Sequence, residues 1–110
     1  MSLDLPFSII LSNVYMTKEA TWTPYEDRVT PGGGTTKVPG TPTTIRVFVE
    51  ELDDYSKTYW SQRFGHVDVS FYTTAAVNRE DVITYNGDDY DVMHVEQYGS
   101  GIRRLICRRR

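Results

Sequence analysis

The chain has 110 residues, of which 39% are hydrophobic and 25% charged, a composition typical of a folded domain with one core. Its longest early apolar stretch, Phe7–Leu11, is too short for a signal-peptide core or for a bilayer span, so we expect a cytoplasmic protein with no membrane partner. Because Cys107 is the only cysteine, a disulfide within one chain is excluded, and we interpret Cys107 as a small apolar residue of the last strand.

The net charge of −3 is unevenly distributed along the chain. Residues 1–102 hold seven basic and fifteen acidic side chains, a net charge of −8, whereas the last eight residues add five arginines and no acidic residue. Such asymmetry indicates an interaction surface, which could contact another protein or a nucleic acid, or else a solvated terminus. The partner-contact candidates here are Arg104, Arg108, Arg109 and Arg110.

The first stretches with a strand-like composition lie in residues 9–23. Ile9–Thr17 and Glu19–Thr23 are rich in β-branched and aromatic residues, and form either a first hairpin or one bent strand.

Residues 24–42 contain four prolines and a Gly32–Gly34 run without any apolar period, which predicts a long loop between strands. Loops of this length are usually functional. The run resembles a phosphate-binding loop only in its glycines, because no GK[ST] closes it and no helix can follow Pro39 and Pro42. The candidate channel or inter-subunit residues of this loop are Thr30, Gly32, Gly33, Gly34, Lys37 and Gly40.

Two stretches alternate with a period of two. In one, Ile45, Val47 and Val49 alternate with polar or bulky residues, and in the other, His66–Tyr72, every second residue is apolar. This pattern predicts strands with one face on a core and the other toward water or a partner.

Between these stretches, residues 53–64 form either one short helix or an irregular loop. A helix would be capped by Asp53, Asp54 or Ser56 and ended by Gly65. Residues 50–64 also carry candidates for a protein interface: an acidic run that suits a basic partner, and an aromatic residue that could be an interface anchor, a core residue or a stacking surface for a base. These candidates are Glu50, Glu51, Asp53, Asp54 and Trp60.

Asn86-Gly87 is the strongest local signal in the chain, because both residues tolerate the positive φ angles of a type I′ turn. A two-residue turn pairs Tyr85 with Asp88 and Ile83 with Tyr90. The second strand should reach about Gln97, and a turn at Gly99–Gly101 should lead into a final strand, residues 102–108, with Leu105 and Cys107 inward and Arg104 and Arg108 outward.

No group of residues has the spacing of a metal or catalytic site. His66 and His94 lack neighbouring ligands, and the acidic turn Asp88, Asp89, Asp91 lacks the order of a calcium loop. We therefore expect no cofactor, no metal and no enzymatic activity. The predicted fold is a single all-β domain over residues 1–110, a small barrel or sandwich of five to six mainly antiparallel strands with one long Gly/Pro-rich loop and at most one short helix.

The hairpin Asp81–Val92, with its motif residues Asp81, Tyr85, Asn86, Gly87 and Tyr90, resembles that of the head-closure (head–tail joining, or stopper) proteins of tailed bacteriophages. In that family an acidic residue and apolar residues lead into a Tyr-x-Gly turn and a Tyr-Glu/Asp-Val strand, followed by a strand like Val95-Glu96 and a last strand with basic and apolar residues. Thr43–Glu50 and His66–Thr73 resemble the family's preceding strands.

The resemblance implies a structural virion protein made in the host cytoplasm. Its subunits would form a ring, of six- or twelve-fold symmetry, between the portal-bound adaptor and the tail, and would close the channel around the packaged DNA. The 24–42 segment and the basic end depart from the family pattern. Open alternatives are a tail-terminator or tail-completion ring, a free nucleic-acid-binding β-barrel, and a small enzyme.

Overall fold

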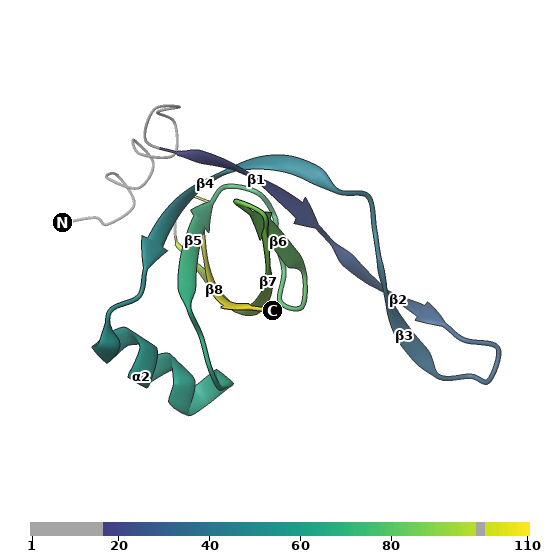
Figure 1. Ribbon diagram of the computed structural model, residues 1–110. Helices are drawn as coiled ribbons and strands as arrows, with labels where there is room; N and C mark the ends of the chain where they lie inside the picture. The colour runs from purple at the N-terminus through teal and green to yellow at the C-terminus, as the bar shows by residue number, and fades with distance from the viewer. Residues whose placement is uncertain (1–16, 99–100) are drawn as a thin grey trace.

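The computed structural model describes residues 17–98 and 101–110. Six antiparallel strands close a barrel in the order β1-β4-β5-β8-β7-β6, and two further strands form a separate two-stranded sheet (Figure 1). The barrel strands are β1 (Lys18–Thr23), β4 (Thr43–Glu51), β5 (Val69–Thr73), β6 (Val82–Tyr85), β7 (Asp88–Gln97) and β8 (Arg103–Arg109). The others are β2 (Tyr25–Val29) and β3 (Thr35–Pro39), and the described helix is α2 (Asp54–Phe64). The predicted small β-barrel is therefore confirmed.

The barrel interior is filled by the alternating residues of its strands. Val47 and Phe71 are fully buried there, and the Phe71 ring meets the Tyr85 and Tyr90 rings edge to face at centroid distances of 5.7 and 5.3 Å. The other buried members of this cluster come from all six barrel strands and from Val77: Ala20, Ile45, Val69, Val77, Ile83, Val92, Leu105 and Cys107. The predicted inward positions of Ile45, Leu105 and Cys107 are confirmed.

A second apolar cluster lies outside the barrel, between its wall and α2. Leu52 and Trp60 pack there on Val67 and Ile106. A bulge between Val92 and His94 adds one residue to β7. Because a bulge shifts the alternation of the strand, Val92 and Val95 both pack on the barrel core while Met93 packs on the outer cluster. β8 is thus buried on both faces, with Ile106 covered by the helix.

The β6–β7 hairpin has the predicted register. Tyr85 pairs with Asp88 and Ile83 pairs with Tyr90. Asn86 and Gly87 have φ angles of 51° and 84°, the pair of positive values that a type I′ turn requires. β7 ends at Gln97 as expected, and β8 begins and ends one residue later than the predicted 102–108.

The prediction of a long loop over residues 24–42 is wrong. Residues 25–39 form the β2–β3 hairpin, which we call the arm, and which projects from the barrel on the side away from α2 (Figure 1). The prolines fit because they lie at the ends of strands, with Pro24 before β2, Pro31 in the tip and Pro39 at the end of β3. The Gly-rich run is the tip of this arm, where Gly33 has a φ of 87°.

Residues 54–64 are helical, which resolves the choice between helix and loop. The Asp53 side chain accepts a hydrogen bond from the Ser56 amide (2.7 Å), and this bond lowers the pKa of the Asp53 carboxyl. Gly65 ends the helix with a φ of 79°. Within the described residues, this helix is the longest one and is too short and too polar to cross a membrane.

Replacing Asp53 with alanine is expected to lower the free energy of unfolding by about 1 kcal/mol, because the first turn of α2 loses its capping acceptor. Urea unfolding followed by circular dichroism measures the change. The matched control is Asp54→Ala, which removes an equal charge one residue later and is expected to cost only about 0.3 kcal/mol. Equal losses for the two variants would show that charge, and not capping, is what matters here.

Candidate functional site

The arm presents open strand edges. The Gly40 amide donates to the Pro24 carbonyl (2.6 Å) at its base, and the Thr30 amide donates to the Gly34 carbonyl (2.8 Å) at its tip. In an antiparallel ladder, hydrogen-bonded and non-hydrogen-bonded pairs alternate, so these two contacts determine the pattern between them. Tyr25 and Pro39, Asp27 and Lys37, and Val29 and Thr35 are therefore the pairs whose backbone groups point away from the arm's own ladder, and the Tyr25 amide is bonded to Asp81.

The arm is joined to the barrel by Asp81, whose carboxylate is 2% exposed. Its Oδ2 accepts hydrogen bonds from Trp22 Nε1 (2.9 Å) and from the Asn78 amide (2.8 Å), and its Oδ1 accepts one from the Tyr25 amide (3.0 Å). These three donors come from β1, from the loop before β6 and from the first residue of the arm. Asp81 therefore determines the direction in which the arm leaves the barrel.

Lys37 makes a second connection between arm and barrel. Its ammonium group lies 3.0 Å from Asp27, across the arm, and 3.0 Å from Glu80, next to Asp81. The hydrogen bonds with Glu80 and Asp27 raise the pKa of Lys37. All three side chains are exposed, and exposed ion pairs contribute little stability, so this bridge orients the arm more than it stabilises it.

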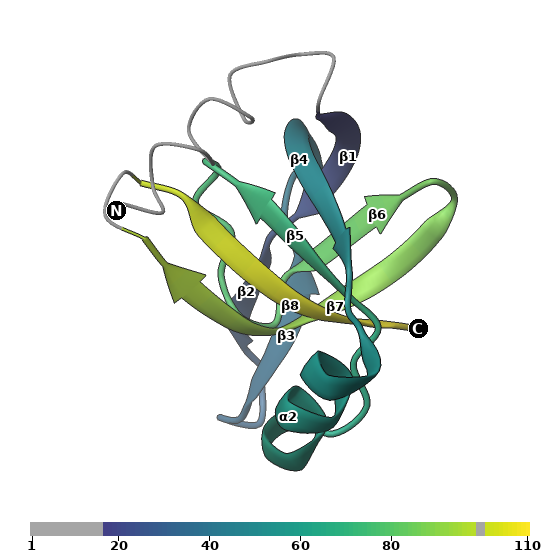
Figure 2. The ribbon, with the colours of Figure 1, turned by 90° about the vertical axis from the view of Figure 1, so that its left-hand side faces the viewer.

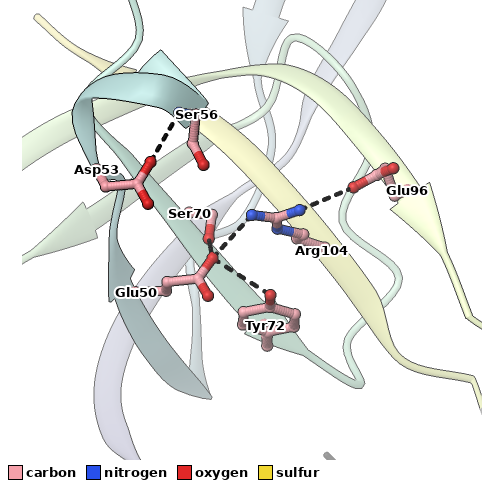
Figure 3. Close-up of polar contacts among 7 residues, drawn as sticks. All are labelled: Glu50, Asp53, Ser56, Ser70, Tyr72, Glu96 and Arg104. Carbon is pink, nitrogen blue, oxygen red and sulfur yellow. Dashed lines mark hydrogen bonds and ion pairs between the residues drawn. The ribbon is translucent and has the colours of Figure 1, made fainter. Parts of the chain in front are cut away.

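A polar network centred on Arg104 covers the outer face of the barrel beside α2 (Figure 3). The guanidinium lies 2.8 Å from Glu50 and 3.3 Å from Glu96, which brings β8 together with β4 and β7. Glu50 also accepts hydrogen bonds from Ser70 (2.8 Å) and Tyr72 (3.3 Å). Arg104 lies on the outer face of the barrel, as predicted. Its side chain is nevertheless only 17% exposed, because neighbouring side chains cover it.

Aromatic rings enclose the same guanidinium. The Tyr72 ring centroid lies 5.6 Å and the Trp60 ring centroid 6.0 Å from Arg104 Cζ, both within the range of a cation–π contact. Burial raises the pKa of Tyr72. Burial would by itself lower the pKa of Arg104, but the interactions of Arg104 with Tyr72 and Glu50 raise it. The hydroxyl therefore stays neutral and the guanidinium charged. The expected partner contacts Trp60, Glu50 and Arg104 are thus used within the subunit.

The other acidic candidates lie beside this network. Glu51 and Asp54 are exposed, whereas Asp53, also exposed, is used to cap α2. Tyr55 and Tyr59 of the helix are 81% and 41% exposed. Glu51, Asp54 and Tyr55 thus remain on the surface as candidates for a partner contact.

The three terminal arginines point to different parts of the barrel. Arg110 forms an ion pair with Asp91 (2.9 Å), while the Arg109 amide donates to Asp68 (2.8 Å). Within residues 17–98 and 101–110, neither the Arg108 nor the Arg109 side chain forms an ion pair. These two, and not the whole arginine group, are the cationic candidates for a partner.

The histidines and the cysteine lie apart. His66 contacts Asp68 (2.8 Å), and the His94 ring stacks on Phe64 (4.8 Å). Among the described residues, no three histidine, cysteine or acidic side chains are grouped in a way that suits a metal ion. Cys107 is fully buried in the barrel core, as expected for a small apolar residue.

Cys107 is expected to react with a water-soluble thiol reagent on the order of a thousandfold more slowly in the folded chain than in urea, because its thiol opens to solvent only on unfolding. Burial also raises the pKa of this thiol, so little thiolate forms at neutral pH. Stopped-flow labelling measures both rates. Similar rates in the two conditions would contradict the buried position of Cys107.

The sequence-based interpretation missed the structural role of two residues. Asp81 was recognised only as the start of the hairpin motif, although it joins three segments, and its partner Trp22 lies 59 residues away. The sequence indicates Arg104 only as an outward-facing candidate for a partner contact. In both cases the decisive contacts join segments far apart in the sequence, Asp81 with Trp22 and Arg104 with Glu50, and no local pattern indicates them.

No protein-family model matches the chain, and no curated protein shows significant similarity to it.

Proposed function

We propose that the chain is a structural subunit of the neck of a tailed-phage virion. Copies form a ring that connects the portal-bound adaptor to the tail and closes the DNA channel after packaging, and no reaction is involved. Support comes from the resemblance of the Asp81–Val92 hairpin to head-closure proteins and from the small barrel, which suits a ring wall. The observation that carries the proposal is the arm.

The arm suits contacts beyond its own barrel. A two-stranded hairpin alone is marginally stable in water, and most side chains of β2 and β3 are exposed. Nevertheless the arm begins at a buried carboxylate that sets its direction. The arm therefore has a fixed direction but no hydrophobic core of its own. Neighbouring subunits in an assembly best explain this combination, because the arm could contact them or extend between them into the channel.

Charge on the rest of the surface agrees with contacts between copies. Glu51 and Asp54 are exposed, as is Arg109, so a ring contact can place the acidic group of one subunit against a cation of the next. Ring closure requires this kind of head-to-tail contact between two different surfaces. The excess of acidic residues over residues 1–102 also suits a channel that repels DNA phosphates and lets DNA slide.

The arm is tested by removing residues 26–38 and joining Tyr25 to Pro39 through Asn-Gly, which keeps the Asp81 contact with the Tyr25 amide. We expect a folded protein, and phage heads that carry it should leak DNA or fail to join tails. The control is Gln62→Ala, at an exposed position of α2 outside the arm and the candidate contacts. Normal yields of infectious particles with the deleted arm would refute its role.

The position within the particle is tested by pull-down. Retention by purified adaptor rings supports head closure, whereas retention by tail tubes alone would favour the tail-terminator alternative. Binding of the free chain to DNA that falls steeply with salt would favour the nucleic-acid-binding alternative.

A further inference from the structure

The large apolar side chains on the surface lie at two places on opposite sides of the molecule. Among the residues that the structure describes, three are exposed: Val29 near the tip of the arm, at 73%, and Tyr55 and Tyr59 on α2, at 81% and 41%. Figure 1 shows the arm and α2 on opposite sides of the barrel, and in Figure 2 α2 lies toward the viewer and the arm behind the barrel. A ring repeats one contact between two different surfaces of each subunit, and these two places suit such a contact.

The half of the arm near its tip is cationic. Within residues 17–98 and 101–110, Arg28 is exposed and forms no ion pair, and residues 28–36 contain no acidic residue. Arg28 and Val29 point to opposite faces of β2, because successive side chains of a strand alternate. A partner that lies along the edge of β2 would therefore meet both side chains, together with the outward backbone groups of Val29.

The first half of α2 has the opposite charge. Asp54 is exposed and, in the part of the chain that the structure describes, forms no ion pair. Tyr55 and Tyr59 lie four residues apart and so share a face of the helix. The Tyr59 ring is held in place, because Arg63 lies over it at 4.9 Å and the Trp60 ring meets it edge to face at 4.9 Å. This surface therefore combines a negative charge with two aromatic rings that carry hydroxyl groups.

We propose that the arm tip of one copy binds the first half of α2 of the next copy around the ring; this inference rests on the proposed function and names the contact that closes the ring. Val29 packs against the rings of Tyr55 and Tyr59, and Arg28 faces Asp54. The tyrosine hydroxyls bond with the outward amide and carbonyl of Val29, which only water satisfies on an open strand edge. Each strand of the arm has five residues and so extends about 17 Å, which brings the tip to the surface of a neighbouring barrel.

The test uses full-length chains with one added cysteine each, Thr35→Cys, directly opposite Val29 on the arm, in one preparation and Thr58→Cys on α2 in another. The two are mixed and oxidised, alone at the highest soluble concentration and on the adaptor ring, and the disulfides are assigned by mass. Both positions are exposed, so the variants should fold, and Cys107 stays buried. We expect about tenfold more disulfide than when Thr74→Cys, an exposed position after β5, replaces Thr58→Cys, because binding raises the local concentration of the two thiols.

A charge exchange tests the pairing of Arg28 with Asp54. Arg28→Glu in the Thr35→Cys chain should lower the disulfide yield about fivefold, because it places two acidic groups together. Adding Asp54→Lys to the Thr58→Cys chain should then restore the yield. The matched control is Arg79→Glu, which reverses another exposed arginine outside the arm and should leave the yield unchanged.

A photo-reactive side chain in place of Tyr55 identifies what lies on α2 in the assembled ring. Attachment to residues 25–39 of another copy supports the inference. Attachment only to the adaptor or to tail proteins would overturn it and assign this face of α2 to them.

Equal disulfide yields with Thr58→Cys and Thr74→Cys on the ring, or no recovery with the charge exchange, would also overturn the inference. If rings form on the adaptor without the disulfide between Thr35→Cys and Thr58→Cys chains, only the inference fails. If this disulfide forms between free copies but no ring assembles on the adaptor, the arm contact stands and the neck function fails.

Discussion

Replacing Asp81 with alanine is expected to lower the free energy of unfolding by about 3–4 kcal/mol. The variant removes one buried carboxylate that accepts three hydrogen bonds, from Trp22 Nε1 and from the Tyr25 and Asn78 amides. The three donors would then lack a partner at a site that is 2% exposed, and unsatisfied buried donors are costly. Urea unfolding followed by tryptophan fluorescence measures the loss, and Trp22 reports directly on the site.

The same change should loosen the arm. Backbone amides of residues 25–39 are expected to exchange hydrogen faster in Asp81→Ala than in the parent protein, relative to amides of β5 and β8. Asp81→Asn is a second useful variant. It keeps one acceptor oxygen, but its amide NH₂ group would face one of the donors that now bond to the carboxylate. It should cost nearly as much as alanine. A loss below about 1 kcal/mol for both variants would mean that the carboxylate contributes no more than one ordinary hydrogen bond.

Replacing Arg104 with alanine is expected to cost about 2–3 kcal/mol. Glu50 and Glu96 would lose their common cation, and the rings of Trp60 and Tyr72 would lose their contact with it. The estimate lies below that for a fully buried pair because the two carboxylates remain about one third exposed. Chemical unfolding at neutral pH gives the value.

Two further variants separate charge from geometry at this site. Arg104→Lys keeps the charge but not the planar fork that reaches two carboxylates, so it should recover only about half of the loss. A double-mutant cycle with Glu50→Gln should show a coupling of about 1 kcal/mol or more. Additive losses would contradict a direct interaction between Arg104 and Glu50 as the source of stability.

The β6–β7 hairpin and the inward faces of β4 and β8 could be predicted because their causes are local. The prediction that the His66–Tyr72 strand turns one face to water or a partner is wrong, because every residue of β5 is buried. Asn86 and Gly87 tolerate positive φ angles better than other residues, and both adopt them. The alternation of Ile45 and Val47 places both side chains on the face that packs in the core. The number of short strands then favours closure into a barrel. These parts of the fold depend on propensities and periods that can be read along the chain.

The arm could not be predicted in this way. Its strands have no apolar alternation because neither face is buried, and its prolines and glycines are typical of a loop. Its formation depends on contacts between distant residues, above all those of Asp81 with the residues at its base. The burial of Arg104 also escaped prediction, since it depends on how α2 packs over β8.

The proposed role as a ring subunit of a phage neck can be tested by native mass spectrometry, which gives the assembly state of the chain alone and after mixing with the portal-bound adaptor ring of the same particle. We expect a monomer alone and a closed ring of fixed subunit number on the adaptor, and we expect the arm-deleted variant to stay monomeric or to bind incompletely. A chain that stays monomeric in the presence of both adaptor rings and tail tubes, at saturating concentration, would contradict it.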